Sequence, residues 1–202
     1  MKYRAGLAVA LTVAMGLVLL VTGSSAQNDD GDMHDWGNGV RFADAEILNA
    51  DGVRLGRVEF ARFDTAPINV VGLWIFLEGL APGFHGVHIH SVGSCDATAE
   101  RPFTSAGSHV NHTDSTHTHG DHDGDLPSVY AVSDGGVAMA YATDRVTVES
   151  LLDEDGSAFI VHADPDNFGH IPERYGTADE TTLATGDAGA RIGCGILVAT
   201  ED

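Results

Sequence analysis

The sequence predicts an all-β fold, an eight-stranded Greek-key barrel or sandwich with two long functional loops. Three observations support this prediction. Apolar and polar residues alternate with the period of a strand in about eight short segments, which are separated by turn residues. No segment carries a convincing amphipathic helical pattern. Two polar segments, 93–124 and 163–190, are too long to be ordinary connections between strands.

The expected strands, in chain order, are 40–48, 53–63, 68–77, 87–90, 129–132, 137–143, 158–162 and 192–199. Asn49-Ala50-Asp51-Gly52 has the composition of a hairpin turn between the first two. The segment 68–77 is apolar on both faces, which is typical of a central strand. Long loops in a compact domain are often functional, so the chemistry is expected in the two loops and at the strand ends beside them.

Residues 1–26 are expected to be an export signal. Lys2 and Arg4 form a charged start, an apolar run follows, and Ser24-Ser25-Ala26 is a small-residue cleavage site. The apolar run is nearly long enough to span a bilayer, so an uncleaved membrane anchor is the alternative. Residues 27–38 are acidic and predict a disordered tether, and residues 39–202 predict one folded domain. We therefore expect an exported protein that is extracellular, periplasmic or associated with the cell envelope.

The chain is strongly acidic, with a formal net charge of −20. Removal of the signal, which carries Lys2 and Arg4 and no acidic residue, makes the charge −22 and leaves no lysine. Such a surface repels nucleic acid and anionic membranes, because phosphate binding needs clustered basic residues. The acidity is therefore interpreted as a device for solubility.

Histidines gather at the predicted strand 87–90 and in the loops. His88 and His90 are two residues apart on a strand, so their side chains share one face and can bind one metal ion. His109 and His162 could complete a set of four nitrogens, which suits copper(II). His122 and Asp125 offer a second, harder site that suits zinc. Two such sites side by side indicate redox chemistry.

The chain has two cysteines, Cys95 and Cys194. An even pair in an exported chain predicts one disulfide. It would close a loop of about a hundred residues, worth ~4–5 kcal/mol in the loop-entropy model. Two thiolate metal ligands are the alternative, which the absence of a CxxC spacing disfavours.

Six motifs occur in an order that resembles one known family. They are His85-Gly86-Val87-His88-Ile89-His90, Gly93-Ser94-Cys95, Ser105-Ala106-Gly107-Ser108-His109, His122-Asp123-Gly124-Asp125-Leu126, Val161-His162, and the segment from Thr185 to Gly195. Over residues 39–199 the chain resembles the copper/zinc superoxide dismutases, in their bacterial, exported branch. Each motif alone is weak, but all six in the same order are specific.

The resemblance implies roles for named residues. It implies a shared, deprotonated His109 between two ions, a disulfide that pins the metal loop to the barrel, and Arg191 as the cation that guides superoxide. The implied copper ligands are His88, His90, His109 and His162. The implied zinc ligands are His109, His119, His122 and Asp125. His117 is the alternative to His119. Asp166 is implied to link a copper ligand to a zinc ligand through hydrogen bonds, and His85 to be structural.

The implied activity is disproportionation of superoxide to oxygen and hydrogen peroxide, with copper cycling between two oxidation states and His109 carrying a proton. A copper store without enzymatic activity is the rival hypothesis, which the surplus histidines favour and the complete ligand set opposes. Both monomers and homodimers fit the family. The second long loop carries six acidic residues against Arg174, so we expect a slow enzyme or acidic groups that face away from copper.

Overall fold

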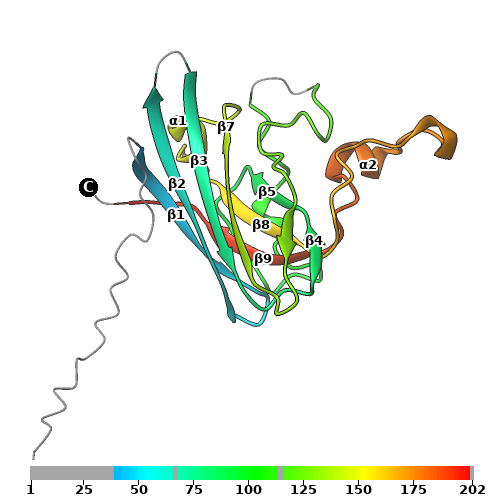
Figure 1. The fold of residues 1–202 in the computed structure, drawn as a ribbon, viewed down its shortest axis with the longest axis horizontal. Coiled ribbons are helices and arrows are strands. Elements are labelled where there is room, and N and C mark those ends of the chain that lie inside the picture. The colour runs from blue at the N-terminus through cyan, green and yellow to red at the C-terminus, as the bar shows by residue number, and fades with distance from the viewer. Residues whose placement is uncertain (1–38, 66–67, 113–115, 201–202) are drawn as a thin grey trace, which may run out of the picture. The chain divides into compact units, whose positions relative to one another are not determined.

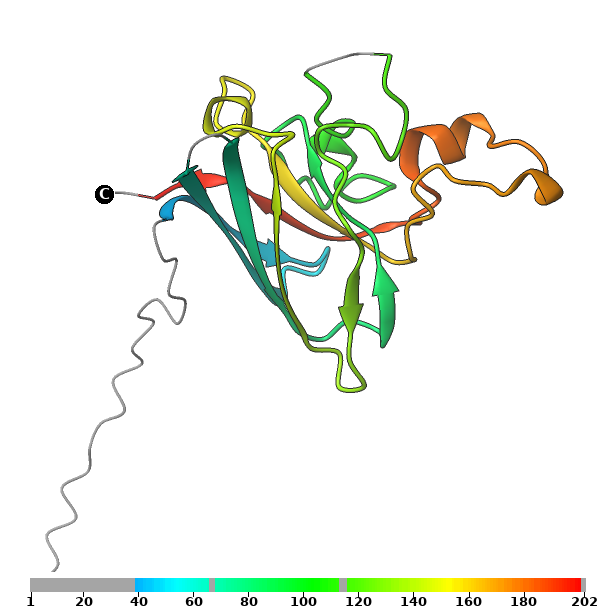
Figure 2. The same ribbon diagram turned by 45° about the horizontal axis from the view of Figure 1, so that its top comes forward.

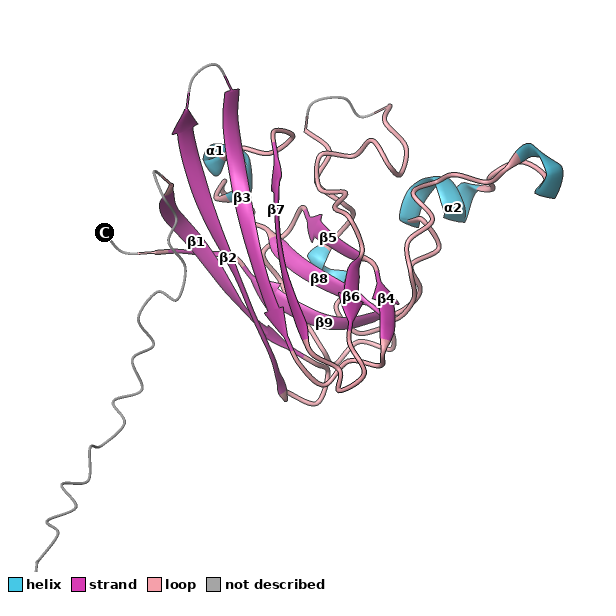
Figure 3. Cartoon of the chain, in the orientation of Figure 1, coloured by secondary structure: helices cyan, strands magenta, loops and turns pink. Residues whose placement is uncertain are grey.

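Strands are the main regular structure of the described chain. The computed structural model describes residues 39–65, 68–112 and 116–200. The strands of this part are β1 (Val40–Leu48), β2 (Arg54–Thr65), β3 (Ile68–Leu77), β4 (Gly83–His85), β5 (Val87–His90), β6 (Val129–Ala131), β7 (Val137–Thr143), β8 (Ala158–His162), β9 (Arg191–Ile196) and β10 (Val198–Ala199). Between them lie the 3-10 turns Thr104–Ala106 and Glu173–Tyr175 and the helices α1 (Val148–Leu151) and α2 (Glu180–Thr185). The all-β prediction is confirmed (Figure 3).

The strands form one large antiparallel sheet that curls into a barrel, and one small sheet (Figure 1). The large sheet has the order β5-β8-β9-β1-β2-β3-β7, with β10 paired to β1, and the small sheet pairs β4 with β6. Gly86 alone separates β4 from the edge strand β5. The turn after β6, in which the Val132 N–H donates to the Gly136 carbonyl at 2.9 Å, leads into the other edge strand, β7. The small sheet is thus continuous in the chain with both edges of the large one, as a Greek-key barrel requires.

The alternation of apolar residues places the core inside the barrel. In β1, Ala43, Ala45 and Ile47 are buried in the apolar core, while Glu46 between the last two is exposed. Strands on the opposite side of the barrel contribute in the same way. Burial of apolar surface, at about 25 cal/mol per Å², is the main stabilising term of such a core.

Strand β5 is buried on both faces. Val87 and Ile89 point into the core, and His88 and His90, which alternate with them, point to the other face. That second face is covered as well, since both histidines have no exposed surface. A buried polar face on a barrel strand needs partners from outside the barrel, and the long loops supply them.

A second apolar cluster forms around the disulfide. Ala158 and Ile160 of β8 pack there against Phe103 and Cys194, with Cys95 at its edge. Cys95 and Cys194 form a disulfide with their Cα atoms 5.8 Å apart, so the predicted bridge is confirmed. It fixes the start of the first long loop to β9.

Apart from shifts of one or two residues at the ends of β2, β6 and β9, the strands differ from the expected ones in two places. The three-residue strand β4 was not expected, because a segment so short shows no alternation. The expected strand 192–199 is two strands, since Leu197 turns inward and its N–H donates to the Ser157 carbonyl at 2.9 Å. Eight strands do form the large sheet, but the expected strand 129–132 lies in the small one. There Phe84 and Tyr130 pack edge to face with ring centroids 5.0 Å apart.

The two short helices lie in connections between strands, α1 between β7 and β8 and α2 between β8 and β9. Helix α2 lies in the second loop, which extends beyond the strands in both views (Figure 1 and Figure 2). Its N-terminus is capped by Asp179, whose carboxylate accepts the Thr182 N–H at 2.9 Å. Helices of four and six residues are too short to show an amphipathic period, which is why the sequence did not reveal them.

The expected signal, 1–26, and tether, 27–38, lie outside the described residues. Among the residues that are described, no helix is long and apolar enough to cross a membrane. Export and anchoring therefore stay predictions from the sequence.

Candidate metal centre

The outer face of β5 is where residues from both long loops meet. Isolated bridges join His88 to Asp125 and His90 to His109, both from the first loop. Asp166, from the second loop, accepts a hydrogen bond from His88 Nε2 at 2.7 Å. The strand therefore provides a rigid base, and the loops bring further ligand-type side chains to it.

Four imidazoles form the first group, here called the imidazole cluster: His88, His90, His109 and His162. One ring nitrogen from each lies within 4.8 Å of the other three, and all four side chains are buried. His88 and His90 come from β5, His162 ends the neighbouring strand β8, and His109 follows the disulfide loop. The structure thus brings together all four residues expected to hold copper.

Hydrogen bonds fix which nitrogen of each ring faces the centre. His90 Nδ1 donates to the Gly107 carbonyl at 3.0 Å, and His162 Nδ1 donates to the Gly189 carbonyl at 3.2 Å. Since a carbonyl can only accept, the opposite nitrogen of each neutral ring carries a lone pair.

The ring nitrogens that make no hydrogen bond are the ones that would bind a metal. His88 Nδ1, His90 Nε2 and His162 Nε2 are buried and have no hydrogen-bond partner. Buried polar atoms without partners are rare in proteins and call for an explanation such as a bound ion. Three orphaned nitrogens that converge on one point fit a metal ion that prefers imidazole, and copper is such an ion.

The second group, here called the aspartate cluster, combines imidazole with carboxylate. His109, His119 and Asp125 are buried, with ligand atoms within 4.8 Å of one another and of His88. His109 Nδ1 lies 2.7 Å from Asp125 Oδ1, and His119 Nδ1 lies 3.2 Å from the same oxygen. His122 lies beside them, its Nδ1 3.3 Å from Asp125 Oδ2. Nitrogen and carboxylate ligands in this number fit zinc.

One carboxylate connects the two clusters. Asp166 accepts from His88 Nε2 at 2.7 Å through Oδ2 and from His119 Nε2 at 2.8 Å through Oδ1. The Phe168 N–H also donates to it, at 2.6 Å. These bonds orient one ring of each cluster, as the resemblance implied for Asp166.

Burial keeps the imidazole cluster neutral. It lowers the pKa of His88 and lowers that of His90 well below its ordinary value. Burial also lowers the pKa of His109 to about 4, against the opposing carboxylate of Asp125, and that of His162 to about 3. At neutral pH each of these rings is therefore neutral, with one N–H and one nitrogen that carries a lone pair.

The aspartate cluster is charged instead. Burial disfavours a proton on His119, but the carboxylates of Asp125 and Asp166 outweigh it and raise the pKa of His119 to about 9. Burial likewise opposes ionisation of both aspartates, yet hydrogen bonds and charges from the histidines lower the pKa of each. Without metal, the cluster is a buried imidazolium between two carboxylates.

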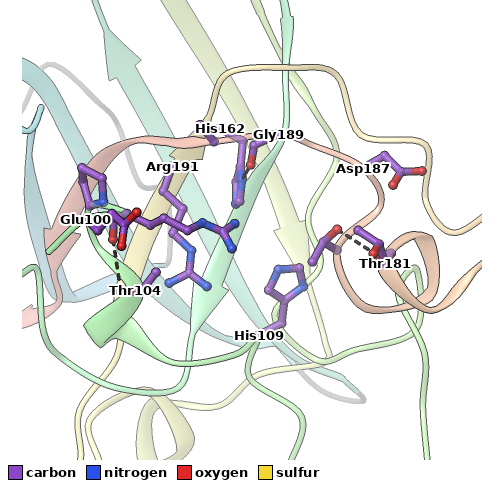
Figure 4. A pocket seen from close by; sticks show the side chains of 12 residues that line it. Glu100, Thr104, His109, His162, Thr181, Asp187, Gly189 and Arg191 are labelled. Carbon is purple, nitrogen blue, oxygen red and sulfur yellow. Dashed lines mark hydrogen bonds between the residues drawn. The ribbon is translucent and has the colours of Figure 1, made fainter.

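A cavity of about 680 Å³ opens onto the imidazole cluster. His109, His162 and Arg191 line it, and Figure 4 shows their side chains gathered on the side opposite Asp187. The Arg191 guanidinium donates to the carbonyls of Phe103 at 2.7 Å and Gly107 at 2.8 Å. Arg191 is thus a half-buried cation held next to two of the imidazoles.

Acidic residues of the second loop mostly lie elsewhere. Among the charged residues that line the cavity, Glu100 and Asp187 face Arg101 and Arg191. The Asp187 carboxylate accepts from Asn167 Nδ2 at 2.6 Å and from Thr182 Oγ1 at 2.8 Å, which ties it to the loop itself. The cavity is therefore balanced in charge although the protein is strongly acidic.

The remaining histidines divide as follows. His85 bonds through Nδ1 to the His162 carbonyl at 2.8 Å and through Nε2 to the Ala81 carbonyl at 2.7 Å, which is a structural role. His112 is exposed, and neither His112 nor His117 belongs to a ligand cluster of the described residues. His119, which is buried, does belong to one, and this favours it over His117.

Sequence reasoning missed the backbone groups that orient the rings. The carbonyls of Gly107 and Gly189 hold His90 and His162, and Gly186 lies against His119 and Asp166, where a Cβ would collide with both. Each glycine has a positive φ, between 59° and 78°. The glycines at 107, 186 and 189 inside the quoted motifs were the available signal.

The fold and site define a metalloprotein that can hold copper at four imidazoles and zinc at a neighbouring histidine–aspartate cluster. The sequence profile described as copper/zinc superoxide dismutase (SODC) matches residues 55–197. The chain belongs to this family.

Individual relatives agree. The protein named superoxide dismutase [Cu-Zn] of Mycobacterium bovis is 37% identical over 193 residues, covering 87% of this chain and 78% of its own. That of Caulobacter vibrioides is 35% identical over 167 residues, covering 77% and 84%.

Solved structures agree as well. A mutant of a SOD-like protein from Bacillus subtilis matches with a TM-score of 0.59 and 31% identity, over 76% of this chain and 95% of its own. The Cu/Zn superoxide dismutase from Brucella abortus matches with a TM-score of 0.58 at 22% identity, over 76% of this chain and 98% of its own, and supports the fold.

Proposed function

We propose that this protein converts two superoxide ions and two protons into dioxygen and hydrogen peroxide. The observation that carries the proposal is the pair of clusters that share His109 and open, through a cavity with a fixed arginine, to solvent. Membership of the copper/zinc superoxide dismutase family supports it.

The ligands follow from the clusters. His88, His90, His109 and His162 hold copper, and His109, His119, His122 and Asp125 hold zinc. Copper bound there supplies one-electron chemistry between two oxidation states, and zinc, which has no redox chemistry, fixes the loop and the basicity of His109. Asp166 keeps one ring of each set in place.

Arg191 binds the substrate. Its guanidinium offers a planar fork of donors, which suits a small anion, and its bonds to the Phe103 and Gly107 carbonyls hold the fork beside His162 and His109. Because the position is fixed before the anion arrives, little ordering is needed on binding.

His109 moves the proton. Its Nδ1 is held by Asp125, so Nε2 is the atom that can take up and release a proton at the cavity. One superoxide would give its electron to copper held by the imidazole cluster and depart as dioxygen, while His109 takes a proton from water. A second superoxide takes that electron, the proton from His109 and one from water, and departs as hydrogen peroxide.

The activity is proposed to act outside the cytoplasm, as the charged, apolar and small-residue segments of 1–26 indicate. N-terminal sequencing of the protein from its own cell tests this. We expect Gln27 as the first residue, and an intact Met1 would instead support an uncleaved anchor.

The activity itself is tested by pulse radiolysis of the protein loaded with copper and zinc, in the presence of EDTA to remove unbound copper. We expect a rate constant near the diffusional range, ~10⁸–10⁹ M⁻¹s⁻¹. The same protein loaded with zinc alone is the control. If the two preparations give equal rates, the enzyme hypothesis is wrong and the clusters are a copper store.

A further inference from the structure

The turn that carries His119 and His122, residues 119–122, lies between two opposite charges. On one side is the buried Asp125 carboxylate. On the other is the guanidinium of Arg145, which follows β7 and belongs to neither long loop. This turn supplies two of the four side chains that the proposed function assigns to zinc, so its position decides whether the aspartate cluster is assembled.

The N–H groups of the turn point to the carboxylate. Gly120 N–H donates to Asp125 Oδ2 at 2.7 Å, and His122 N–H donates to the same oxygen at 3.0 Å. These bonds hold the turn from inside.

The carbonyls of the same two residues point to the arginine. Arg145 Nη1 donates to the Gly120 carbonyl at 2.9 Å and to the His122 carbonyl at 3.2 Å. The His122 carbonyl also accepts the Asp125 N–H at 3.2 Å, which closes the turn onto the aspartate. A single guanidinium nitrogen of Arg145 thus binds the carbonyls of Gly120, which follows His119, and of His122.

Arg145 is itself held in place by its neighbours. Its N–H donates to Thr143 Oγ1 at 3.2 Å, and the next residue, Val146, is buried in the core. Thr147 then forms a capping box with Ser150 at the start of α1, which fixes the backbone on the far side. The guanidinium therefore extends from a rigid corner of the barrel, and not from a second loose loop.

We propose that Arg145 is a positioning residue for zinc: it preorganises the turn 119–122 so that His119 and His122 face Asp125 before the ion binds. The inference rests on the proposed function, because it takes the aspartate cluster as the zinc site. Arg145 contacts no ligand atom and acts through the two carbonyls and through Asp121 of the same turn, whose Oδ1 lies 3.9 Å from Arg145 Nη2. Its side chain is 39% exposed, so we expect a modest effect.

The test compares the affinity of the metal-free protein for zinc, by competition with a chelator of known affinity, in Arg145→Gln, Arg145→Lys and Arg54→Gln. Arg54 is an exposed arginine on β2 that pairs with Glu46, so its variant makes the same change in charge away from the turn. We expect Arg145→Gln to weaken zinc binding about 3–10-fold, below the ~10–100-fold range typical of buried outer partners. Arg145→Lys should restore part of the loss.

Copper(I) affinity, measured by competition in the same variants, separates positioning from general stability. We expect it to change much less than the zinc affinity, because the turn 119–122 reaches the imidazole cluster only indirectly, through the Asp166 carboxylate that bonds both His119 and His88. The positioning role of Arg145 is wrong if Arg145→Gln and Arg54→Gln bind zinc with equal affinity. It is also wrong if Arg145→Gln loses affinity for zinc and for copper(I) to the same extent. If Arg145→Gln does not fold, the same comparison is made with Arg145→Lys. Failure of the unchanged protein to bind zinc overturns the proposed function as well.

Discussion

The two metal clusters are built by different means although they lie side by side. The imidazole cluster rests on strands: His88 and His90 alternate with core residues of β5, and His162 ends β8 beside them. The aspartate cluster draws its ring and carboxylate groups from the single loop that holds His109, His119, His122 and Asp125. A strand fixes side-chain direction through its backbone, whereas a loop needs hydrogen bonds and charges to do so.

Their charges differ for the same reason. Burial is the largest influence on each pKa of the imidazole cluster, and its rings are neutral, with a pKa of about 3 for His162. In the aspartate cluster, carboxylates hold a proton on His119, with a pKa of about 9, and keep the metal-free loop together. Without metal, the imidazole cluster therefore presents nitrogens with lone pairs, whereas the aspartate cluster contains an ion pair between His119 and the two carboxylates.

The largest effect is expected from His90→Gln, which removes one of the four converging nitrogens from a rigid strand. Copper(I) affinity should fall by more than the ~10–100-fold that loss of an outer hydrogen-bond partner costs, and dismutation should fall with it. Zinc affinity should hardly change, because His90 is not part of the aspartate cluster. His112→Gln, at an exposed loop histidine, is the control. Equal copper affinity in the two variants would contradict the assignment.

The second largest effect is expected from Gly186→Ala, because Gly186 lies against His119 and Asp166, which link the two clusters. At φ 59° any side chain is strained, and here the new Cβ would also collide with His119 and Asp166. Gly52→Ala is the matched control, since its φ is 77° but nothing lies within 4 Å of the new Cβ. Both variants should lose ~1–2 kcal/mol of unfolding free energy to backbone strain, and Gly186→Ala a further ~1–3 kcal/mol to the collision.

Thermal unfolding of the metal-free proteins and zinc competition measure the difference between these glycine variants. Gly186→Ala should weaken zinc binding, and Gly52→Ala should not. Identical behaviour of the two variants would show that the Asp166 link tolerates displacement and that the clusters are independent.

The same contrast explains what could be predicted from the sequence. Strand period placed His88 and His90 on one face without any structure, and the family's motifs identified His109, His162 and Asp125. The resemblance favoured His119 over His117, but strand period could not test that choice, because a loop has no period. The structure supports His119 because its Nδ1 lies 3.2 Å from Asp125 and its Nε2 lies 2.8 Å from Asp166, and these two carboxylates come from different loops. The sequence did not reveal the roles of Arg145 and the glycine carbonyls either, because their contacts also join distant parts of the chain.

Proton release should distinguish the two clusters at pH 7.5. Because the pKa of His119 is raised to about 9, zinc binding to the metal-free protein must displace its proton, about one per ion. Zinc affinity should therefore rise with pH up to about 9. Copper(I) binding should release almost no protons, because the pKa of His109 is lowered to about 4 and that of His162 to about 3. Calorimetric titration in two buffers of different ionisation enthalpy measures both. Zinc heats that do not depend on the buffer would contradict the ion pair.

The smallest effect is expected where the imidazole cluster meets solvent. Arg101 and Arg191 both line the cavity, and besides burial the charge of Arg101 lowers the pKa of Arg191, so the two cations act on the same space. Arg101→Gln should slow dismutation about 2–3-fold at low ionic strength and have no effect near 1 M salt, where the Debye length is ~3 Å. Arg174→Gln makes the same charge change at a residue that stacks on Tyr175 and does not line the cavity, so its rate should stay at the unchanged protein's value. Equal slowing in both variants would mean that the overall charge of −20, and not the cavity, governs access of the anion.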